Sequence, residues 1–377
     1  MSNPIIPISS IELQRALALR DLSDPSQGAH GIQLILNELT VGIADKIQTS
    51  LRVERPHPVV TVESNYDALL IPEGVATREA RYTRYVNETH MLRSHTSAAL
   101  PPLLKKYAEL ESSVDVLLAV PGLVYRRDQV DRTHVGEPHQ LDLWRLSSNK
   151  DLTGERLLEL MGSVAHAVLP SAEWRTIPAV HPYTVEGLQL EVRLHGEWLE
   201  LGEGGLIHPQ LMRAAGLPDT YSGLAMGLGL DRALMLRKGL TDIRYLRSSV
   251  PAVMEQLNTL EPWIPVSQQP AAKRDVSIAR NDLLDDEILG DLCRQALGDD
   301  SSLLEEAVIV STATHEELPK AAHERLGMTT EQTNVLIRLT LRSLEHTLTA
   351  EETNELRDRI YLSIHQGSNI SELTVTK

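Results

Sequence analysis

The chain has 377 residues, 42% of them hydrophobic, which is enough to bury a substantial core, most readily in two domains. Its formal net charge of −16 argues against nonspecific binding to nucleic acid. The single cysteine excludes an internal disulfide and a cysteine-built zinc site, and we expect an intracellular, cytoplasmic protein. The sequence has no apolar run of membrane-spanning length and no signal-peptide order at its start, so we expect no membrane partner.

The first third of the chain predicts helices separated by one β segment. Residues 9–22 predict a short helix with Ser10 as a candidate cap. Between residues 31 and 51, isoleucine and leucine recur at helical spacing, which predicts an amphipathic helix. A β segment follows over residues 56–62, and a further helix is predicted from His95 to about residue 111.

The densest group of arginines, histidines and carboxylates lies in residues 124–142, with the sequence VYRRDQVDRTHVGEPHQLD. Runs of β-prone residues flank this segment, which predicts a hairpin made of a strand, a long polar loop and a second strand. Such a loop can bind a polyanion when its guanidinium groups converge on phosphate oxygens. The alternative is a solvated loop with surface ion pairs.

The middle of the chain predicts one helix followed by several strands. Residues 151–168 carry an apolar side at helical spacing, and we expect this helix to pack on a sheet. Strands are predicted at 180–185, 188–194 and 197–202, and an antiparallel arrangement would direct their alternating polar side chains into one cleft. Residues 221–236, YSGLAMGLGLDRALML, predict a glycine-rich strand that runs into a helix carrying one arginine.

The C-terminal part begins with a proline-containing linker over residues 251–269. The elements predicted beyond it follow the order β-α-β-β-α, with a poorly marked final strand in residues 368–377. They are strands at 273–278, 304–312 and 334–341, a helix at 283–297 and a last helix opening at Leu348.

Three of these segments together resemble one family. Residues 124–142 resemble the second signature motif of class II aminoacyl-tRNA synthetases, in the form peculiar to phenylalanyl-tRNA synthetase. Residues 221–236 resemble the third motif, and residues 91–97, MLRSHTS, resemble the first substrate-contacting segment. Three motifs in order are a specific signal, whereas the glycine-rich run alone would be weak.

The resemblance implies an α+β fold, with the class II antiparallel sheet and its flanking helices in residues 1–250. The linker at 251–269 would then join this catalytic domain to a small ferredoxin-like domain of the anticodon-binding type in residues 270–377. The chemistry implied is attack of an amino-acid carboxylate on the α-phosphorus of ATP. Catalysis then consists mostly of alignment and charge stabilisation, and needs no general base.

The resemblance also assigns nucleotide contacts. Arg126 would bind the α-phosphate and the attacking carboxylate, and His134 the outer phosphates. Asp128 would contact the adenine edge, and Arg232 would lie against one face of adenine while it reaches the γ-phosphate. Pro138 stands where the family has an aromatic platform for adenine, which predicts altered ATP affinity.

Small residues and carboxylates complete the nucleotide site that the resemblance implies. Gly227 and Gly229 would let backbone and ligand approach closely. Mg²⁺ prefers oxygen ligands and joins carboxylates to phosphates, and Glu200 is the candidate ligand. Glu203, close by, is expected to face solvent.

The amino-acid site follows from the same resemblance. His181 and Tyr183 replace two rings that flank a phenyl group in the family, and they add hydrogen-bonding ability. Because a site built to bond a hydroxyl can reject the analogue lacking it by ~10⁴–10⁵, we expect altered preference for phenylalanine, with tyrosine or another polar aromatic amino acid as the alternative. The residues implied to contact the amino acid are His95, Ser97, Gln140, Asp142, His181, Tyr183 and Ala225, of which Gln140 and Asp142 would hold its ammonium group.

The charge of the C-terminal part argues against tight binding of tRNA. Residues 267–377 contain 11 Lys and Arg against 20 Asp and Glu, a balance of −9, whereas tRNA affinity depends on phosphate contacts from basic residues. A local basic face formed by Arg274, Arg338, Arg342, Arg357 and Arg359 is the alternative. A synthetase paralogue that senses an amino acid, or that acylates another acceptor, therefore stays open beside a tRNA ligase, and both a monomer and a homodimer are compatible with the family.

The chain contains no phenylalanine, although it has 9 tyrosines and 4 tryptophans. Phenylalanine is a major core-forming residue, so its absence indicates selection more than compositional drift. One hypothesis is that this protein must be made when charged phenylalanine tRNA is scarce.

Overall fold

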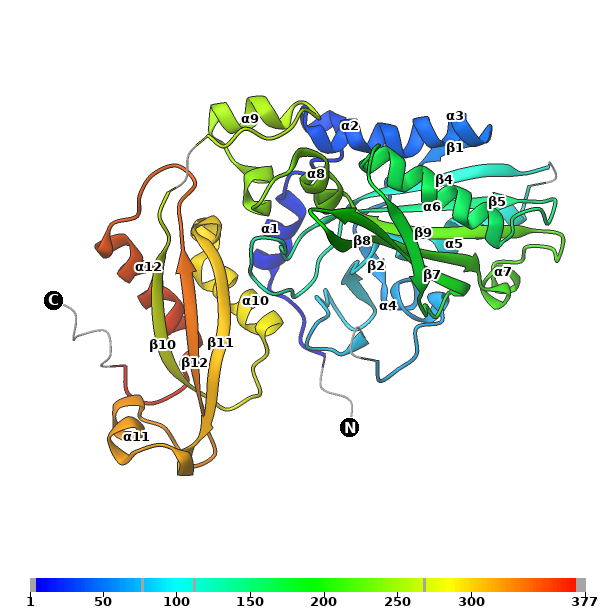
Figure 1. Cartoon of the computed structure of the whole chain (residues 1–377). Coiled ribbons are helices and arrows are strands. Elements are labelled where there is room, and N and C mark those ends of the chain that lie inside the picture. Colours follow the sequence, from blue (N-terminus) through cyan, green and yellow to red (C-terminus); the bar gives the residue numbers. More distant parts are fainter. Residues whose placement is uncertain (1–4, 76–77, 111–112, 267–268, 371–377) are drawn as a thin grey trace. The chain divides into compact units, whose positions relative to one another are not determined.

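The computed structural model describes residues 5–75, 78–110, 113–266 and 269–370, and the chain divides into two compact units (Figure 1). Unit 1 comprises Met1–Arg126, Glu137–Leu240 and Glu255–Trp263. Unit 2 comprises Arg127–Gly136, Thr241–Met254 and Ile264–Lys377. The loop of the signature hairpin is therefore grouped with unit 2, whereas both of its strands belong to unit 1.

Unit 1 is built on a seven-stranded sheet in the order β1-β4-β5-β9-β8-β7-β6. Only the edge strand β1 runs parallel to its neighbour, and all other pairs are antiparallel. The predicted hairpin is confirmed, because β4 and β5 pair along their whole length. The strands are β1 Ser50–Val53, β4 Asp115–Leu123, β5 His139–Ser147, β6 Trp174–Pro178, β7 Thr184–Leu194, β8 Glu197–Ile207 and β9 Ser222–Gly229, and β2 Val59–Thr61 and β3 His90–Leu92 form a separate pair.

Helices cover both faces of this sheet (Figure 1). On one face lie α2 Gly31–Asn37, α3 Ile43–Ile47, α6 Gly154–Val168 and α8 Leu230–Lys238. On the other face, α4 Val62–Asn65 and α5 Leu100–Ala108 contact the 3-10 turn Thr96–Ala99, which rests on β4 and β5. The apolar side of α6 is buried as its spacing predicts, and α5 packs against Trp144 and the buried valines of β4. Two further helices are α1 Ser10–Ala18 and α7 Pro209–Ala214.

Several predicted boundaries are wrong. In the stretch 180–185, residues 180–183 are not in a strand, since Pro182 has no backbone N–H to donate to a ladder, and β7 begins only at Thr184. Strand β6 was not predicted. Ser9, and not Ser10, caps α1, with Glu12 completing a capping box. The long helix predicted from residue 31 ends at Ile47, and β1 follows it.

Unit 2 contains a three-stranded antiparallel sheet in the order β10-β12-β11, packed against α10 Asp286–Leu297 and α12 Ala350–Ile364. The strands are β10 Ala272–Arg280, β11 Leu304–Thr314 and β12 Thr333–Leu341. The predicted β-α-β-β-α order is confirmed, with one unpredicted helix, α11 Lys320–Leu326, between β11 and β12. The predicted final strand falls largely on residues 371–377, outside the described residues.

The proline-containing segment after residue 250 is partly helical, since α9 spans Pro251–Leu257. Proline suits the first turn of a helix because its missing N–H would have no partner there. In the part of the chain that the structure describes, no helix has the length and apolar character needed to cross a lipid bilayer.

Candidate active site

Several side chains predicted to bind the amino acid, among them Ser97, Gln140 and Asp142, lie on the face of the sheet that carries α5. Paired residues of antiparallel strands project their side chains to the same face. On this face, the middle strand β9 presents only glycine or alanine opposite Gln140, Asp142 and Trp144. This strand therefore forms a floor almost without side chains. The register gives three rows across β5, β9 and β8: Gln140 with Gly229; Asp142 with Gly227 and Glu203; Trp144 with Ala225 and Gly205.

Asp142 is the central carboxylate of the site and is only 1% exposed. It accepts hydrogen bonds from the hydroxyls of Thr96 (2.5 Å) and Ser97 (2.9 Å) and from Nε1 of Trp144 (3.0 Å). Burial raises the pKa of Asp142, and these three hydrogen bonds act in the opposite direction. The positive charge of Arg93 also acts to lower this pKa, but the effect of burial is larger, and no ion pair of Asp142 is found among the described residues.

His95 lies immediately before these two hydroxyl donors. Both of its ring nitrogens are buried and make no hydrogen bond of ordinary geometry among the described residues, although the Asn65 backbone is close enough to act against the lowering of its pKa. Burial and, next, the positive charge of Arg126 lower the pKa of His95 to about 3, so the ring is neutral near pH 7. A buried polar atom without a partner is costly, and a polar ligand at this place would satisfy it.

Arg126 and Arg232 border the same row of the sheet. Arg126 donates from Nε to the carbonyl of Ser94 (2.7 Å) and from Nη2 to Oε1 of Gln140 (3.2 Å). Arg232 lies in the first turn of α8. A Cβ placed on Gly229 would be 3.8 Å from the Cβ of Arg232. No ion pair or hydrogen bond of the Arg232 guanidinium is found among the described residues. Two guanidinium side chains thus start from either side of the Gln140–Gly229 pair.

His181 and Tyr183 line the other end of the rows. Nε2 of His181 lies 2.9 Å from Oε2 of Glu203, and its Nδ1 lies 3.2 Å from Oγ1 of Thr184. Glu203 keeps 43% of its side chain exposed, in line with the expectation that it faces solvent, and its carboxylate also lies within hydrogen-bonding distance of His181. Tyr183 stacks on Trp144, with 5.8 Å between ring centroids and 14° between planes, and burial raises its pKa.

Glu200 is exposed, and a β-bulge gives it a defined neighbour. The register between β7 and β8 shifts, so that Gln189 pairs with Glu203 and Glu191 pairs with Glu200. Glu191 accepts hydrogen bonds from Arg175 (2.7 Å) and Gln189 (3.1 Å). Within residues 5–370 as described, no cluster of three His, Cys, Asp or Glu side chains is arranged to hold a metal ion.

Two predicted nucleotide contacts, Asp128 and His134, belong to the loop that is grouped with unit 2. The backbone oxygen of Asp128 accepts from Nη2 of Arg294 (2.7 Å), and Nδ1 of His134 lies 2.8 Å from Oδ2 of Asp131. Pro138, in unit 1, is half-buried, and its carbonyl accepts from the N–H of Val124 (3.0 Å). The remaining predicted contacts all lie in unit 1.

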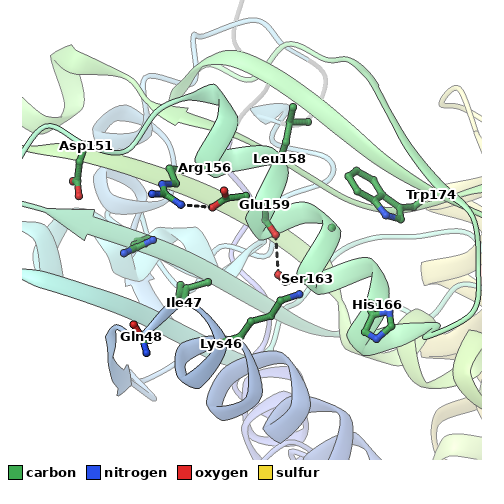
Figure 2. Close-up of a pocket in the computed structure, with 12 residues that line it drawn as sticks. Lys46, Ile47, Gln48, Asp151, Arg156, Leu158, Glu159, Ser163, His166 and Trp174 are labelled. Carbon is green, nitrogen blue, oxygen red and sulfur yellow. Dashed lines mark hydrogen bonds and ion pairs between the residues drawn. The ribbon is translucent and has the colours of Figure 1, made fainter.

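A cavity of about 690 Å³ lies between α3, α6 and β6 (Figure 2). Arg156, Glu159 and Ser163 line it and are linked by a 2.7 Å ion pair and a 2.8 Å hydrogen bond to the Glu159 carbonyl. Arg145 also lines the cavity, and it follows Trp144 on β5, so the two side chains point to opposite faces of the sheet. The cavity is therefore separate from the rows that contain Asp142.

Three residues of the site were not anticipated. Thr96 and Trp144 both donate to Asp142, and Glu203 pairs with His181. The spacing of two residues between Asp142 and Trp144 was a usable signal, because alternate residues of a strand share a face. The pairing of Glu203 depends on strand register, which its local sequence does not encode.

Sequence comparisons relate this chain to known proteins. Residues 36–257 match the family model described as tRNA synthetases class II core domain (F), a range that contains the three rows. The chain is 28% identical over 326 residues to "Phenylalanine--tRNA ligase, chloroplastic/mitochondrial" of Arabidopsis thaliana, covering 83% of this chain and 71% of the relative. It is 30% identical over 349 residues to "Phenylalanine--tRNA ligase, mitochondrial" of Mus musculus (80% and 71%), and 34% identical over 209 residues to "Phenylalanine--tRNA ligase alpha subunit" of Prochlorococcus marinus strain MIT 9313 (54% and 59%). The chain therefore belongs to the class II tRNA synthetase core-domain family (F) and is an aminoacyl-tRNA ligase.

Proposed function

We propose that this ligase activates an aromatic amino acid with ATP and transfers it to tRNA, with the rows of β5, β9 and β8 as its activation site. The observation that carries the proposal is Asp142, a buried carboxylate held by three donors beside a floor formed by Gly227. In this proposal, the ammonium group of an amino acid forms an ion pair with this carboxylate. Gln140, on the same face of β5, offers a second oxygen to it.

Arg126 orients the reacting groups in this proposal. Its hydrogen bonds to Ser94 and Gln140 fix the guanidinium beside the ammonium position, where it can bind both the α-phosphate and the attacking carboxylate. Arg232 supplies the flat surface for adenine. Asp128 and His134 are proposed to reach the adenine edge and the outer phosphates, and Pro138 replaces an aromatic platform with a smaller ring.

Class II synthetases use Mg²⁺ with ATP, and this chain has suitable oxygen donors. Glu200, whose carboxylate is exposed, pairs in register with Glu191. Mg²⁺ is commonly bound by one or two carboxylates together with substrate phosphates, so Glu200 would hold it, whereas both carboxylate oxygens of Glu191 already accept hydrogen bonds. When bound, the ion would neutralise phosphate charge.

The amino-acid side chain would lie over Ala225, against the stacked rings of Tyr183 and Trp144. His95 and Ser97 border the same space, and His181 adds polarity at its rim. A flat apolar slot with polar groups at its edge favours an aromatic side chain, and a substituted ring more than a plain phenyl group.

One observation favours a second candidate, a paralogue that uses little or no tRNA. Four of the five arginines that could form a basic face in unit 2 lie against carboxylates, and the fifth, Arg274, donates from Nε to Asn354 (2.9 Å). Glu305, the partner of Arg342, is shared with Arg132 and Arg244, so it does not neutralise Arg342 alone. Carboxylates beside these arginines lower the positive potential that would attract tRNA phosphates. The pairs are Arg338 with Asp275 (2.7 Å), Arg342 with Glu305 (2.5 Å), Arg357 with Asp358 (2.5 Å) and Arg359 with Asp300 (2.5 Å).

Two assays test these proposals. Amino-acid-dependent pyrophosphate exchange, run with each of the twenty amino acids, should respond only to aromatic ones. If none of the twenty amino acids supports exchange, the proposed activation is refuted. If phenylalanine alone supports it, the proposed change in the side-chain pocket is refuted. Charging of total tRNA then separates a tRNA ligase from a paralogue that stops at the adenylate. Sedimentation velocity of the same protein decides between the monomer and the homodimer.

A further inference from the structure

Glu203 occupies a position across the site from Asp142. The two residues share a row with Gly227 between them, so their backbones are two strand spacings apart, or about 10 Å. Because the middle residue has no side chain, nothing on β9 separates the two carboxylates. An amino acid whose ammonium group binds Asp142 would extend across β9, over Gly227 and Ala225, with Glu203 on the far side.

The contacts of Glu203 leave one of its oxygens available. Oε2 is paired with Nε2 of His181 at 2.9 Å, whereas no partner of Oε1 is found among the described residues. Gln189, its neighbour in register, donates to Glu191 instead. The hydrogen bond from His181 holds the pKa of Glu203 below its usual range, so the carboxylate is ionised near neutral pH.

His181 itself cannot supply the missing contact to a ligand. Its two ring nitrogens are both used, one by Glu203 and the other by Thr184. The neighbouring surface is otherwise formed by the rings of Tyr183 and Trp144. Glu203 is therefore an available acceptor that β8 presents across β9 from Asp142, and His181 acts by orienting it.

We infer that Glu203 is a specificity-determining residue, whose free carboxylate oxygen accepts a hydrogen bond from a donor on the side chain of the substrate. This inference rests on the proposed activation of an aromatic amino acid and narrows it to rings that carry a hydroxyl or amino substituent. A hydrogen bond from a neutral donor to an ionised carboxylate is stronger than one between two neutral groups. An unsubstituted phenyl ring would leave the Glu203 carboxylate partly desolvated and without a donor.

The test compares wild-type protein with Glu203→Ala and Glu203→Gln in pyrophosphate exchange. The substrates are phenylalanine, tyrosine, 3-hydroxyphenylalanine and 4-aminophenylalanine, and the readout is the ratio of each substituted substrate's kcat/KM to that of phenylalanine. Glu197→Gln is the matched control, since Glu197 is an exposed glutamate at the start of the same strand. Thermal melting verifies that each variant folds.

Wild type should prefer at least one substituted ring, and Glu203→Ala should lower that ratio by ~10- to 100-fold. Glu203→Gln, which keeps a neutral acceptor, should lower the ratio less, and Glu197→Gln should leave it unchanged. A ratio that stays constant in Glu203→Ala would overturn the inference. Calorimetry measures the ratio of the binding constants of the same four amino acids without any activation step. If exchange fails with every substrate, the proposed function is refuted, and the calorimetric ratio still tests the role of Glu203.

Discussion

Replacing Asp142 with asparagine should separate the function of this residue from its effect on folding. The ammonium group of the substrate would lose an ionic partner in a buried place, where removing one member of a charge pair costs about 2–5 kcal/mol. This corresponds to a decrease in kcat/KM for the amino acid of ~30- to 5000-fold. The KM for ATP should change little, because Asp142 has no proposed contact with the nucleotide.

The folded protein should tolerate the same substitution. Ser97 and Trp144 donate to Oδ1 of Asp142, and Thr96 donates to Oδ2. Asparagine can keep its oxygen toward the first two donors and place its amide toward Thr96, whose hydroxyl can turn to accept. All three hydrogen bonds can therefore persist without the charge.

The effect on stability has a definite sign. Because burial raises the pKa of Asp142 in the folded state, ionisation of this group destabilises the folded protein as the pH rises above the unfolded value. The substitution removes this penalty. The free energy of unfolding at pH 7 should be equal to or higher than that of wild type, and any gain should disappear in acid, where both states bind the proton.

The assays are pyrophosphate exchange and urea unfolding of the wild type and the variant. Asp115→Asn is the control, since Asp115 forms a partly exposed pair with Arg145, on β5 (3.0 Å), and should affect stability by less than ~1 kcal/mol and exchange not at all. Retention of kcat/KM within threefold, or a loss of more than ~2 kcal/mol of stability, would refute the reasoning about Asp142.

Three other predictions concern separate features of the chain. Acidification from pH 6.5 toward 3 should destabilise the wild type through His95, because the unfolded chain binds a proton that the folded site, with a pKa of about 3, does not bind. This contributes at most about 1.4 kcal/mol per pH unit to the free energy of unfolding, and urea melts of His95→Asn should lack this contribution. Arg232→Lys should raise the KM for ATP by ~10-fold or more and leave the KM for the amino acid unchanged, because a lysine ammonium group cannot stack on adenine; equal KM values for ATP in exchange kinetics would contradict this role. Under phenylalanine limitation, the level of this phenylalanine-free protein should fall less than that of phenylalanine-containing neighbours, as measured by quantitative mass spectrometry, and an equal decline would point to compositional drift.

The spacing of apolar residues was sufficient to predict helices and strands in which buried positions recur at regular intervals. The apolar spacing in residues 151–168 predicted α6, and the β-prone runs around residues 124–142 predicted β4 and β5. Where proline interrupts the pattern, prediction was wrong, as at the turn before Thr184. The unpredicted strand β6 is at a sheet edge, with mostly exposed or half-buried residues, so its sequence carries little hydrophobic periodicity.

The candidate site shows the same division. Gln140 and Asp142 were identifiable from the sequence, because motif order and spacing of two residues along a strand are local properties. The pairing of Glu203 with His181 was not, because a β-bulge and the register of β7, β8 and β9 bring these residues together. The sequence also did not predict that His134 is grouped with unit 2.

The amino-acid sequence by itself determined which elements form, which family motifs occur and which residue types are available for the chemistry. Only the tertiary structure decided that Asp142 is buried under three donors, that Glu203 lies across a glycine from it, and that the basic residues of unit 2 are mostly paired with acids. The physical reason is that burial, register and charge pairing depend on residues far apart in the chain, whose mutual positions are set by packing and not by local conformational preference.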